Sequence, residues 1–108
     1  SNYKNTNIKE YAIYVTMKHG LSGLTKSMAS YYGQYNIRVN SLCPGGVFND
    51  AAKNKKELIF FKNYFKNSAI KRMCNSKDIS NAAIFLSSEY SKYITGVNLP
   101  IDGGFSCI

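Results

Sequence analysis

Tyr14-Val-Thr-Met-Lys18 and the run that follows it, His19-Gly-Leu-Ser-Gly-Leu-Thr-Lys-Ser-Met-Ala29, form the stretch around which the rest of the chain is organised. Its apolar residues recur every three to four positions, as they do on one face of an α-helix. Residues four apart on a helix are neighbours, with Cβ atoms roughly 5–6 Å apart, so the Tyr14 hydroxyl and the Lys18 ammonium can point into one cleft. A fixed cation favours the ionised form of a nearby phenol, which suits such a pair to general acid/base catalysis.

The spacing of Tyr14 and Lys18 is not specific by itself. With 9 Tyr and 14 Lys or Arg in 108 residues, about one Tyr-x-x-x-Lys is expected by chance. The order of the later motifs is more informative, and it runs Ile37-Arg-Val-Asn-Ser-Leu-Cys-Pro-Gly45, then Asp78-Ile-Ser-Asn-Ala-Ala-Ile-Phe-Leu-Ser-Ser88, then Ile94-Thr-Gly-Val-Asn-Leu-Pro-Ile-Asp-Gly-Gly104. In this order the motifs resemble the C-terminal half of the short-chain dehydrogenase/reductase family, over nearly the whole chain.

The resemblance implies a fold class, a cofactor and a substrate class. The fold would be α/β, the C-terminal part of a Rossmann-type doubly wound parallel sheet, with a long helix, a strand, lid helices, a further helix and an edge strand. The cofactor would be NAD or NADP, in hydride transfer to or from a carbonyl/alcohol substrate. The segment from Tyr3 to Lys18 is similar to members linked to surface-glycan and flagellin modification, which implies a sugar or sugar-nucleotide.

The resemblance also assigns the catalytic pair. Tyr14 would be the acid/base, and Lys18 would be its cationic partner and would hold the nicotinamide ribose. Tyr11 lies seven residues before Lys18, which is about 10.5 Å along a helix and too far for a hydrogen bond. The family's catalytic serine lies upstream of the tyrosine. Ser1 falls 13 residues before Tyr14, but an insert at 3–6 would place the true serine before residue 1.

The turn Pro44-Gly45-Gly46-Val47 matches the family's contact to the nicotinamide ring and its carboxamide. It follows a predicted strand, and ligands in open α/β sheets bind at the carboxyl ends of strands. We expect its amides to be exposed. An ordinary turn at a strand exit is the alternative. Phe48 and Asn49 stand where members commonly have a Thr, so the family's hydroxyl contact to the cofactor is not matched here.

Length limits how much of this fold the chain can contain. A dinucleotide site is built from two βαβαβ halves, and the first contains a glycine-rich turn that holds the pyrophosphate. No Gly-x-Gly-x-x-Gly or Gly-x-x-x-Gly-x-Gly follows an apolar strand in the 108 residues. We therefore expect residues 1–108 to be a single partial domain, the C-terminal half of an NAD(P)-binding domain whose N-terminal half is absent. The chain would be a fragment of a longer protein or a truncated gene product.

The composition limits which other classes of protein function are possible for this chain. The net charge of +8 is compatible with a small basic nucleic-acid-binding module, because a basic face releases counterions from phosphate. Much of the Lys is interleaved with Asn in 53–77, however, which favours a compositional bias over a binding face, and an inactive remnant is a third possibility. No apolar run approaches a membrane span. Three Cys at spacings that fit neither a disulfide framework nor a metal site indicate reduced thiols in a cytoplasmic protein.

Two segments of regular structure are predicted in the first half. A helix is expected from Ile8 to Tyr32, stopped by Gly33, and a buried strand over Ile37–Cys43. Gly20 and Gly23 each lower helix stability by roughly 1 kcal/mol relative to Ala. Their presence suggests the close approach of another backbone, which in the family is often the same helix of a second subunit in a homodimer or homotetramer.

The second half is predicted to hold a lid, a helix and an edge strand. Residues 50–72 carry an aromatic cluster at helical spacing, at the position of the family's lid over the substrate. Ser76 is expected to cap the next helix, with Asp78 favoured near its N-terminus. Val97–Ile101 alternates like a strand, and Pro100 places that strand at a sheet edge. The cluster comprises Phe60, Phe61, Tyr64 and Phe65.

Overall fold

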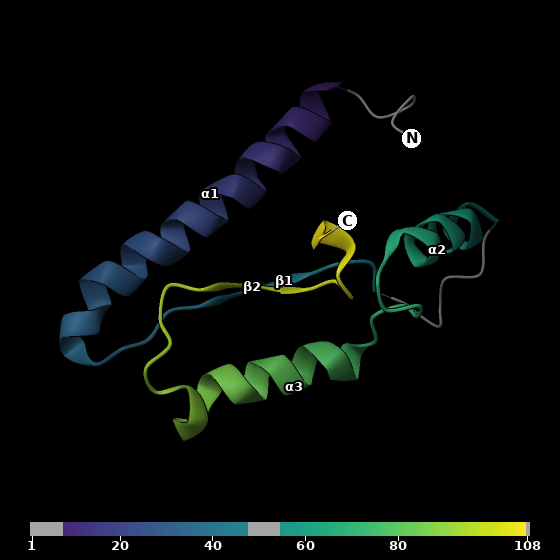
Figure 1. Cartoon of the computed structure of the whole chain (residues 1–108). Helices are drawn as coiled ribbons and strands as arrows, with labels where there is room; N and C mark the ends of the chain where they lie inside the picture. The colour runs from purple at the N-terminus through teal and green to yellow at the C-terminus, as the bar shows by residue number, and fades with distance from the viewer. Residues whose placement is uncertain (1–7, 48–54, 108) are drawn as a thin grey trace. The chain divides into compact units, whose positions relative to one another are not determined.

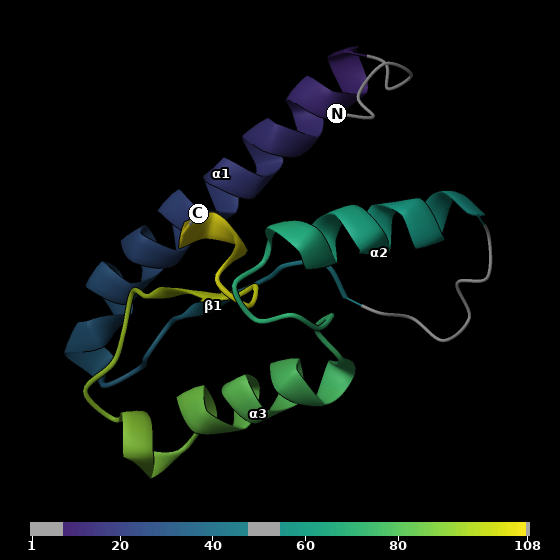
Figure 2. The same cartoon turned by 45° about the vertical axis from the view of Figure 1, so that its right-hand side comes forward.

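The computed structural model describes residues 8–47 and 55–107. The chain divides into two compact units. Unit 1 runs up to Ser41 and includes Thr95–Val97, and unit 2 contains Leu42–Ile94 and the residues from Asn98 onward. Figures 1 and 2 show the elements of both units. No helix in the described part of the chain is long and apolar enough to cross a membrane.

Unit 1 is built on the predicted long helix. Helix α1 (Ile8–Tyr32) has the predicted bounds and leads into a 3₁₀ turn at Gly33–Tyr35. Asn36 ends that turn with a left-handed φ of 58°, a conformation that Asn tolerates better than most residues. The Ile37 amide then donates to Tyr32 O at 3.2 Å. The helix therefore ends where Gly33 predicted.

Most of the apolar stripe on α1 is exposed within the described residues. Ile13, Met17 and Leu21 are 60%, 69% and 51% exposed. Among residues 12–32 of this helix, for which burial is described, Thr25 and Ala29 are the buried ones, and a Cβ at Gly96 would lie 3.4 Å from Ala29 Cβ. A Cβ at Gly20 or Gly23 would meet no other atom of the described chain within 4 Å. The described residues therefore do not supply the close approach predicted at these glycines.

A parallel strand pair is the centre of unit 2. Strand β1 (Ser41–Pro44) lies beside β2 (Asn98–Ile101). Ser41 donates to Val97 O and Gly45 donates to Ile101 O, at 2.9 and 3.0 Å, so both strands run in the same direction. Among the described residues β2 has β1 as its one neighbour, so the predicted edge strand is confirmed there.

The predicted bounds of the first strand were shifted. The strand was expected over Ile37–Cys43, but β1 covers Ser41–Pro44. Residues before it are still joined to the other segment, since Val39 N–H donates to Thr95 Oγ1 at 3.1 Å and Val39 O accepts from Gly96 N–H at 2.7 Å. β-branched composition favoured a strand there, but side-chain partners replace regular ladder bonds. Pro44 remains in the strand because the bond that continues the ladder is made by the next residue, Gly45.

Helix α2 (Lys55–Asn67) carries the predicted aromatic cluster. Its C-terminal end lies against the C-terminal turn, which is the segment of residues 102–107 that follows β2. Figure 2 shows this turn beside the C-terminal end of α2. Ser68 is fully buried, and its hydroxyl donates to Ile70 O at 2.8 Å. Ile70 N–H in turn donates to Gly103 O at 2.8 Å. Backbone bonding therefore fixes the end of α2 to the segment that follows β2.

The N-terminal cap of helix α3 (Ser76–Ser87) is Asn75, not Ser76 as predicted. Asn75 Oδ1 accepts from Asp78 N–H at 2.9 Å, and Asp78 Oδ2 accepts from Asn75 N–H at 3.0 Å, which together form a capping box. The favourable place of Asp78 in the first turn is confirmed. The predicted inner stripe of α3 is half-buried, at Ile79, Ala82, Ala83 and Leu86.

Candidate functional site

Tyr14 and Lys18 lie together on α1. Lys18 Nζ is 5.5 Å from the centroid of the Tyr14 ring, a distance at which an ammonium interacts with an aromatic face. The Tyr14 side chain is 58% exposed within the described residues, so its hydroxyl is accessible. The geometry therefore offers one hydroxyl and one cation from a single turn of helix.

Other polar side chains around this pair are bound to the helix itself. Thr16 Oγ1 donates to Ala12 O at 2.8 Å, and His19 Nδ1 lies 2.9 Å from Val15 O. Such bonds to the carbonyl four residues earlier are common for Thr within helices. They turn these groups back onto the helix backbone. Tyr14 and Lys18 are thus the residues of this turn whose polar ends suit a ligand.

The segment Pro44–Val47 lies in unit 2 and differs from the predicted exposed turn. Gly45 N–H donates to Ile101 O at 3.0 Å, and Gly46 O accepts from Cys74 N–H at 3.3 Å. Val47 continues this pairing as a parallel bridge to Cys74. The prediction of exposed amides is therefore wrong for Gly45, because the strand ladder continues one residue beyond Pro44.

Tyr64 explains why two glycines follow β1. A Cβ placed on Gly45 would overlap the Tyr64 hydroxyl oxygen and would lie 2.9 Å from Asp102 Cβ. A Cβ on Gly46 would lie 3.0 Å from the Tyr64 ring and 2.9 Å from Met73 Cε. The distances below 3.0 Å are shorter than real Cβ contacts in folded proteins, so the close packing inside unit 2 favours glycine at both positions.

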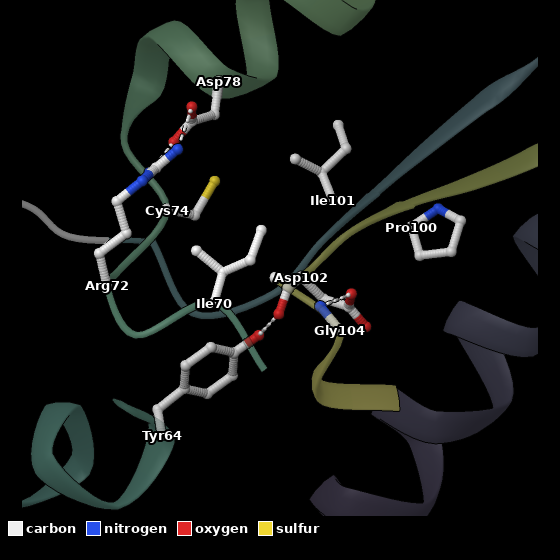
Figure 3. Close-up of a pocket in the computed structure, with 10 residues that line it drawn as sticks. Tyr64, Ile70, Arg72, Cys74, Asp78, Pro100, Ile101, Asp102 and Gly104 are labelled. Atoms are coloured by element: carbon white, nitrogen blue, oxygen red, sulfur yellow. Dashed lines mark hydrogen bonds and ion pairs between the residues drawn. The ribbon is translucent and has the colours of Figure 1, made fainter. Parts of the chain in front are cut away.

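A cavity of about 350 Å³ lies within unit 2 at the end of β2. Figure 3 shows the Tyr64 hydroxyl pointing to the Asp102 carbonyl on one side and the Arg72–Asp78 pair on the other. Ile70, Pro100 and Ile101 add apolar side chains to its lining. The cavity is therefore lined by both apolar and charged groups.

The titratable groups that line this cavity differ in their protonation state. Hydrogen bonding by Arg72 is the main reason that the pKa of Asp78 falls to about 2. Hydrogen bonding by Ser106 lowers the pKa of Asp102. Burial raises the pKa of the Cys74 thiol. At neutral pH the two carboxyls are thus ionised and the thiol is protonated, which makes Cys74 a poor nucleophile.

Sequence reasoning identified Tyr14, Lys18 and Pro44–Val47 but missed the contacts made by Tyr64. In the structure, Tyr14 and Lys18 belong to unit 1, and Pro44–Val47 belongs to unit 2. Tyr64 was visible only as one member of an aromatic cluster. Its partners Asp102 and Phe105 lie about forty residues later, and spacing along a helix cannot indicate such a contact.

Comparison with known proteins identifies the family. A family model described as "Enoyl-(Acyl carrier protein) reductase" matches residues 1–106. Xanthoxin dehydrogenase from Arabidopsis thaliana is 38% identical over 104 residues, covering 87% of this chain and 36% of that protein. The chain spans 35–40% of the length of this and seven other curated relatives that it matches.

Solved structures agree in fold. A short chain dehydrogenase from Leptospira borgpetersenii with bound NAD+ has a TM-score of 0.78 and 37% identity, covering 95% of this chain and 40% of that one. A structure described as a candidate 2-deoxy-D-gluconate 3-dehydrogenase from Agrobacterium tumefaciens, with bound NADP, has a TM-score of 0.80 and 32% identity, covering 88% and 39%. The predicted α/β fold, part of a Rossmann-type sheet, is confirmed by these neighbours. The chain therefore belongs to the short-chain dehydrogenase/reductase family.

Proposed function

We propose that this chain is the C-terminal part of an NAD(P)-dependent oxidoreductase that interconverts a hydroxyl and a carbonyl on a small molecule. The observation that carries the proposal is the Tyr14–Lys18 pair, with Nζ 5.5 Å from the ring centroid, in a chain that matches the family over residues 1–106. An exposed hydroxyl beside a cation is what proton exchange with a substrate oxygen needs.

Tyr14 is the proposed acid/base. In the oxidative direction its ionised oxygen takes the proton of the substrate hydroxyl as hydride leaves the same carbon. In the reductive direction the protonated hydroxyl gives that proton to the oxygen of the carbonyl that receives hydride. Lys18 places its ammonium 5.5 Å from the centroid of the Tyr14 ring, close to the side chain that exchanges the proton. Its exposed position on the same face also lets the ammonium donate to the hydroxyls of a ribose.

The residues present are compatible with a nicotinamide cofactor. When bound, the cofactor supplies or accepts the hydride. Tyr14 and Lys18 would contact its ribose. Pro44–Val47 would contact the ring through backbone groups, because Tyr64, Asp102 and Met73 occupy the space where side chains of Gly45 and Gly46 would project. The neighbours in solved structures hold NAD+ in one case and NADP in another, so the proposal covers both forms.

The proposed substrate is a sugar or sugar-nucleotide. The likeness of Tyr3–Lys18 to glycan-modifying members and the match to a candidate deoxygluconate dehydrogenase support a substrate rich in hydroxyls. Homodimer or homotetramer formation is proposed with it, supported by the exposed apolar stripe of α1, on which Ile13 and Met17 are 60% and 69% exposed. A cytoplasmic location is part of the same proposal.

The test is an oxidoreductase assay on the complete protein that contains this chain. We expect turnover with NAD+ or NADP+ in a panel of sugar alcohols, sugar-nucleotides, steroids and acyclic alcohols, with the sugar compounds most active. Tyr14→Phe, with Tyr31→Phe as a matched control on the same helix, connects the activity to the proposed site. Absence of turnover together with absence of cofactor binding by the complete protein would refute the function. Turnover confined to steroids would refute the sugar substrate alone.

A further inference from the structure

Tyr64 of α2 contacts the C-terminal turn through both its ring and its hydroxyl. The ring is stacked on Phe105, with centroids 4.6 Å apart and 5° between the planes. The hydroxyl donates to Asp102 O at 3.2 Å. The side chain is half-buried, and Figure 3 shows it reaching from α2 to the segment after β2. Tyr64 thus connects the helix to that segment.

The same side chain covers the two glycines after β1. Its hydroxyl oxygen occupies the place of a Cβ on Gly45, and its ring carbons Cγ and Cδ2 lie 3.0 Å from a Cβ placed on Gly46. Gly46 is buried. Tyr64 therefore fills the space into which side chains at these two positions would project, so a change in its position would change the packing beside the backbone of Gly45–Gly46.

The two ends of α2 differ in how they are held. The C-terminal end is fixed by the buried Ser68 and by the bond from Ile70 to Gly103. Nearer the N-terminal end, Leu58, Ile59 and Phe60 are 52%, 51% and 55% exposed. Tyr64 lies one turn before the fixed end. A shift of α2 about that end would therefore displace Tyr64 relative to Gly45 and Gly46.

We propose that Tyr64 is a positioning residue that couples the position of α2 to the backbone of Gly45–Gly46. The coupling rests on the contacts within unit 2. Its consequence for the reaction rests on the proposed function, in which Pro44–Val47 contacts the cofactor. Tyr64 then sets how firmly the cofactor is held without touching the reacting atoms. Helix α2 and the segment proposed to hold the cofactor would respond to each other through one side chain.

The coupling is tested by NMR on the complete protein labelled with ¹⁵N at glycine, in which this chain contributes 8 glycines. We expect Tyr64→Leu to shift the amide signals of Gly45 and Gly46 and to leave those of Gly20 and Gly23 in place. Tyr64→Phe removes only the hydroxyl, so it is expected to shift Gly45 more than Gly46. Tyr31→Leu is the matched control, since Tyr31 packs against Tyr32 in unit 1. Unchanged Gly45 and Gly46 signals in both Tyr64 variants would overturn the coupling.

Kinetics of the complete protein test the consequence. Tyr64→Leu is expected to raise the cofactor KM about tenfold with a much smaller change in kcat, because ground-state cofactor binding is weakened while the proton-transfer pair is intact. Tyr64→Phe should recover most of the loss. An unchanged cofactor KM in Tyr64→Leu would overturn the positioning role. If the protein transfers no hydride with any cofactor, the proposed function fails, and the glycine signals still decide whether Tyr64 couples the two segments.

Discussion

Arg72 and Asp78 form a two-point ion pair, with Nη1 to Oδ2 at 2.6 Å and Nη2 to Oδ1 at 2.9 Å. The same carboxylate accepts from Asn75 N–H at the start of α3. One side chain thus caps a helix and binds the arginine before it. Planar two-point pairs of this kind are stronger and more specific in geometry than single contacts.

The first prediction concerns the stability of the folded chain at low pH. Asp78 has a pKa of about 2 in the folded chain, below its value near 3.9 when unfolded. A lowered folded pKa contributes stability above pH ~4 that is lost as pH falls toward ~2. The melting temperature is therefore expected to fall over this window, and Asp78→Asn should flatten that part of the profile. Circular dichroism measures the melting temperature at each pH, and Glu89→Gln is the control. An equal fall of the melting temperature in Asp78→Asn and in the wild type would contradict this prediction.

Capping gives the second prediction. Asn75→Ala removes the acceptor for Asp78 N–H and is expected to lower the free energy of unfolding by about 1 kcal/mol. Ser76→Ala, one residue later, should change it by no more than a few tenths, because Ser76 is already inside the helix. Urea denaturation of both variants measures the difference. A larger loss for Ser76→Ala than for Asn75→Ala would show that the cap is misassigned.

The third prediction separates Tyr14 from its neighbour Tyr11. In the complete protein, Tyr14→Phe is expected to lower kcat by at least about 10²-fold with cofactor affinity nearly unchanged, because the proton-transfer group is lost while Lys18 and Pro44–Val47 still hold the cofactor. Tyr11→Phe should be mild. Steady-state kinetics with cofactor titration provide both numbers. Equal losses from the two substitutions would remove Tyr14 from its assigned role.

The fourth prediction concerns Lys18. Lys18→Met keeps the length of the side chain but removes the ammonium that lies near the Tyr14 ring. Both turnover and cofactor affinity are expected to fall, since one charge is proposed to act on the phenol and on the ribose. Lys26→Met, two turns further along α1, is the control. If only kcat falls, the ribose contact has to be abandoned.

The fifth prediction concerns the 108-residue chain by itself. It is expected not to bind NAD(H) or NADP(H) measurably, because pyrophosphate recognition depends on a glycine-rich βα turn and a helix N-terminus that this sequence lacks. The two described strands belong to a larger expected sheet, so the chain by itself should also self-associate. Fluorescence titration with reduced cofactor and size-exclusion chromatography measure both. Saturable micromolar binding by a monodisperse monomer would show this account to be wrong.

Local sequence signals predicted some elements well and others only in part. Helix α1 has the predicted bounds because its apolar period and Gly33 are both local signals. The first strand began four residues later than predicted, because Val39 is bonded to the Thr95 side chain instead of a regular ladder. At α3 the composition indicated a cap, but two adjacent polar residues could supply it, and only the backbone conformation of Asn75 decides between them.

Some features of the candidate site could likewise be predicted from the sequence, and others could not. Tyr14 and Lys18 could be paired from sequence because they are one helical turn apart. The need for Gly45 and Gly46 could be noticed but not explained, since its cause is the Tyr64 side chain on a distant helix. The extra ladder bond from Gly45 to Ile101 could not be foreseen either. Contacts between segments far apart in sequence leave no periodic pattern to detect.

Parallel pairing imposes an order on folding. Val39 and Thr95, which a hydrogen bond joins, are 56 residues apart in sequence. Closing a loop of that length costs about 3.6 kcal/mol of chain entropy before any ladder bond contributes. The hydrogen bonds of α1 and α3 are local and form on a much shorter timescale. Pairing of β1 with β2 is therefore expected to be slower than formation of these two helices.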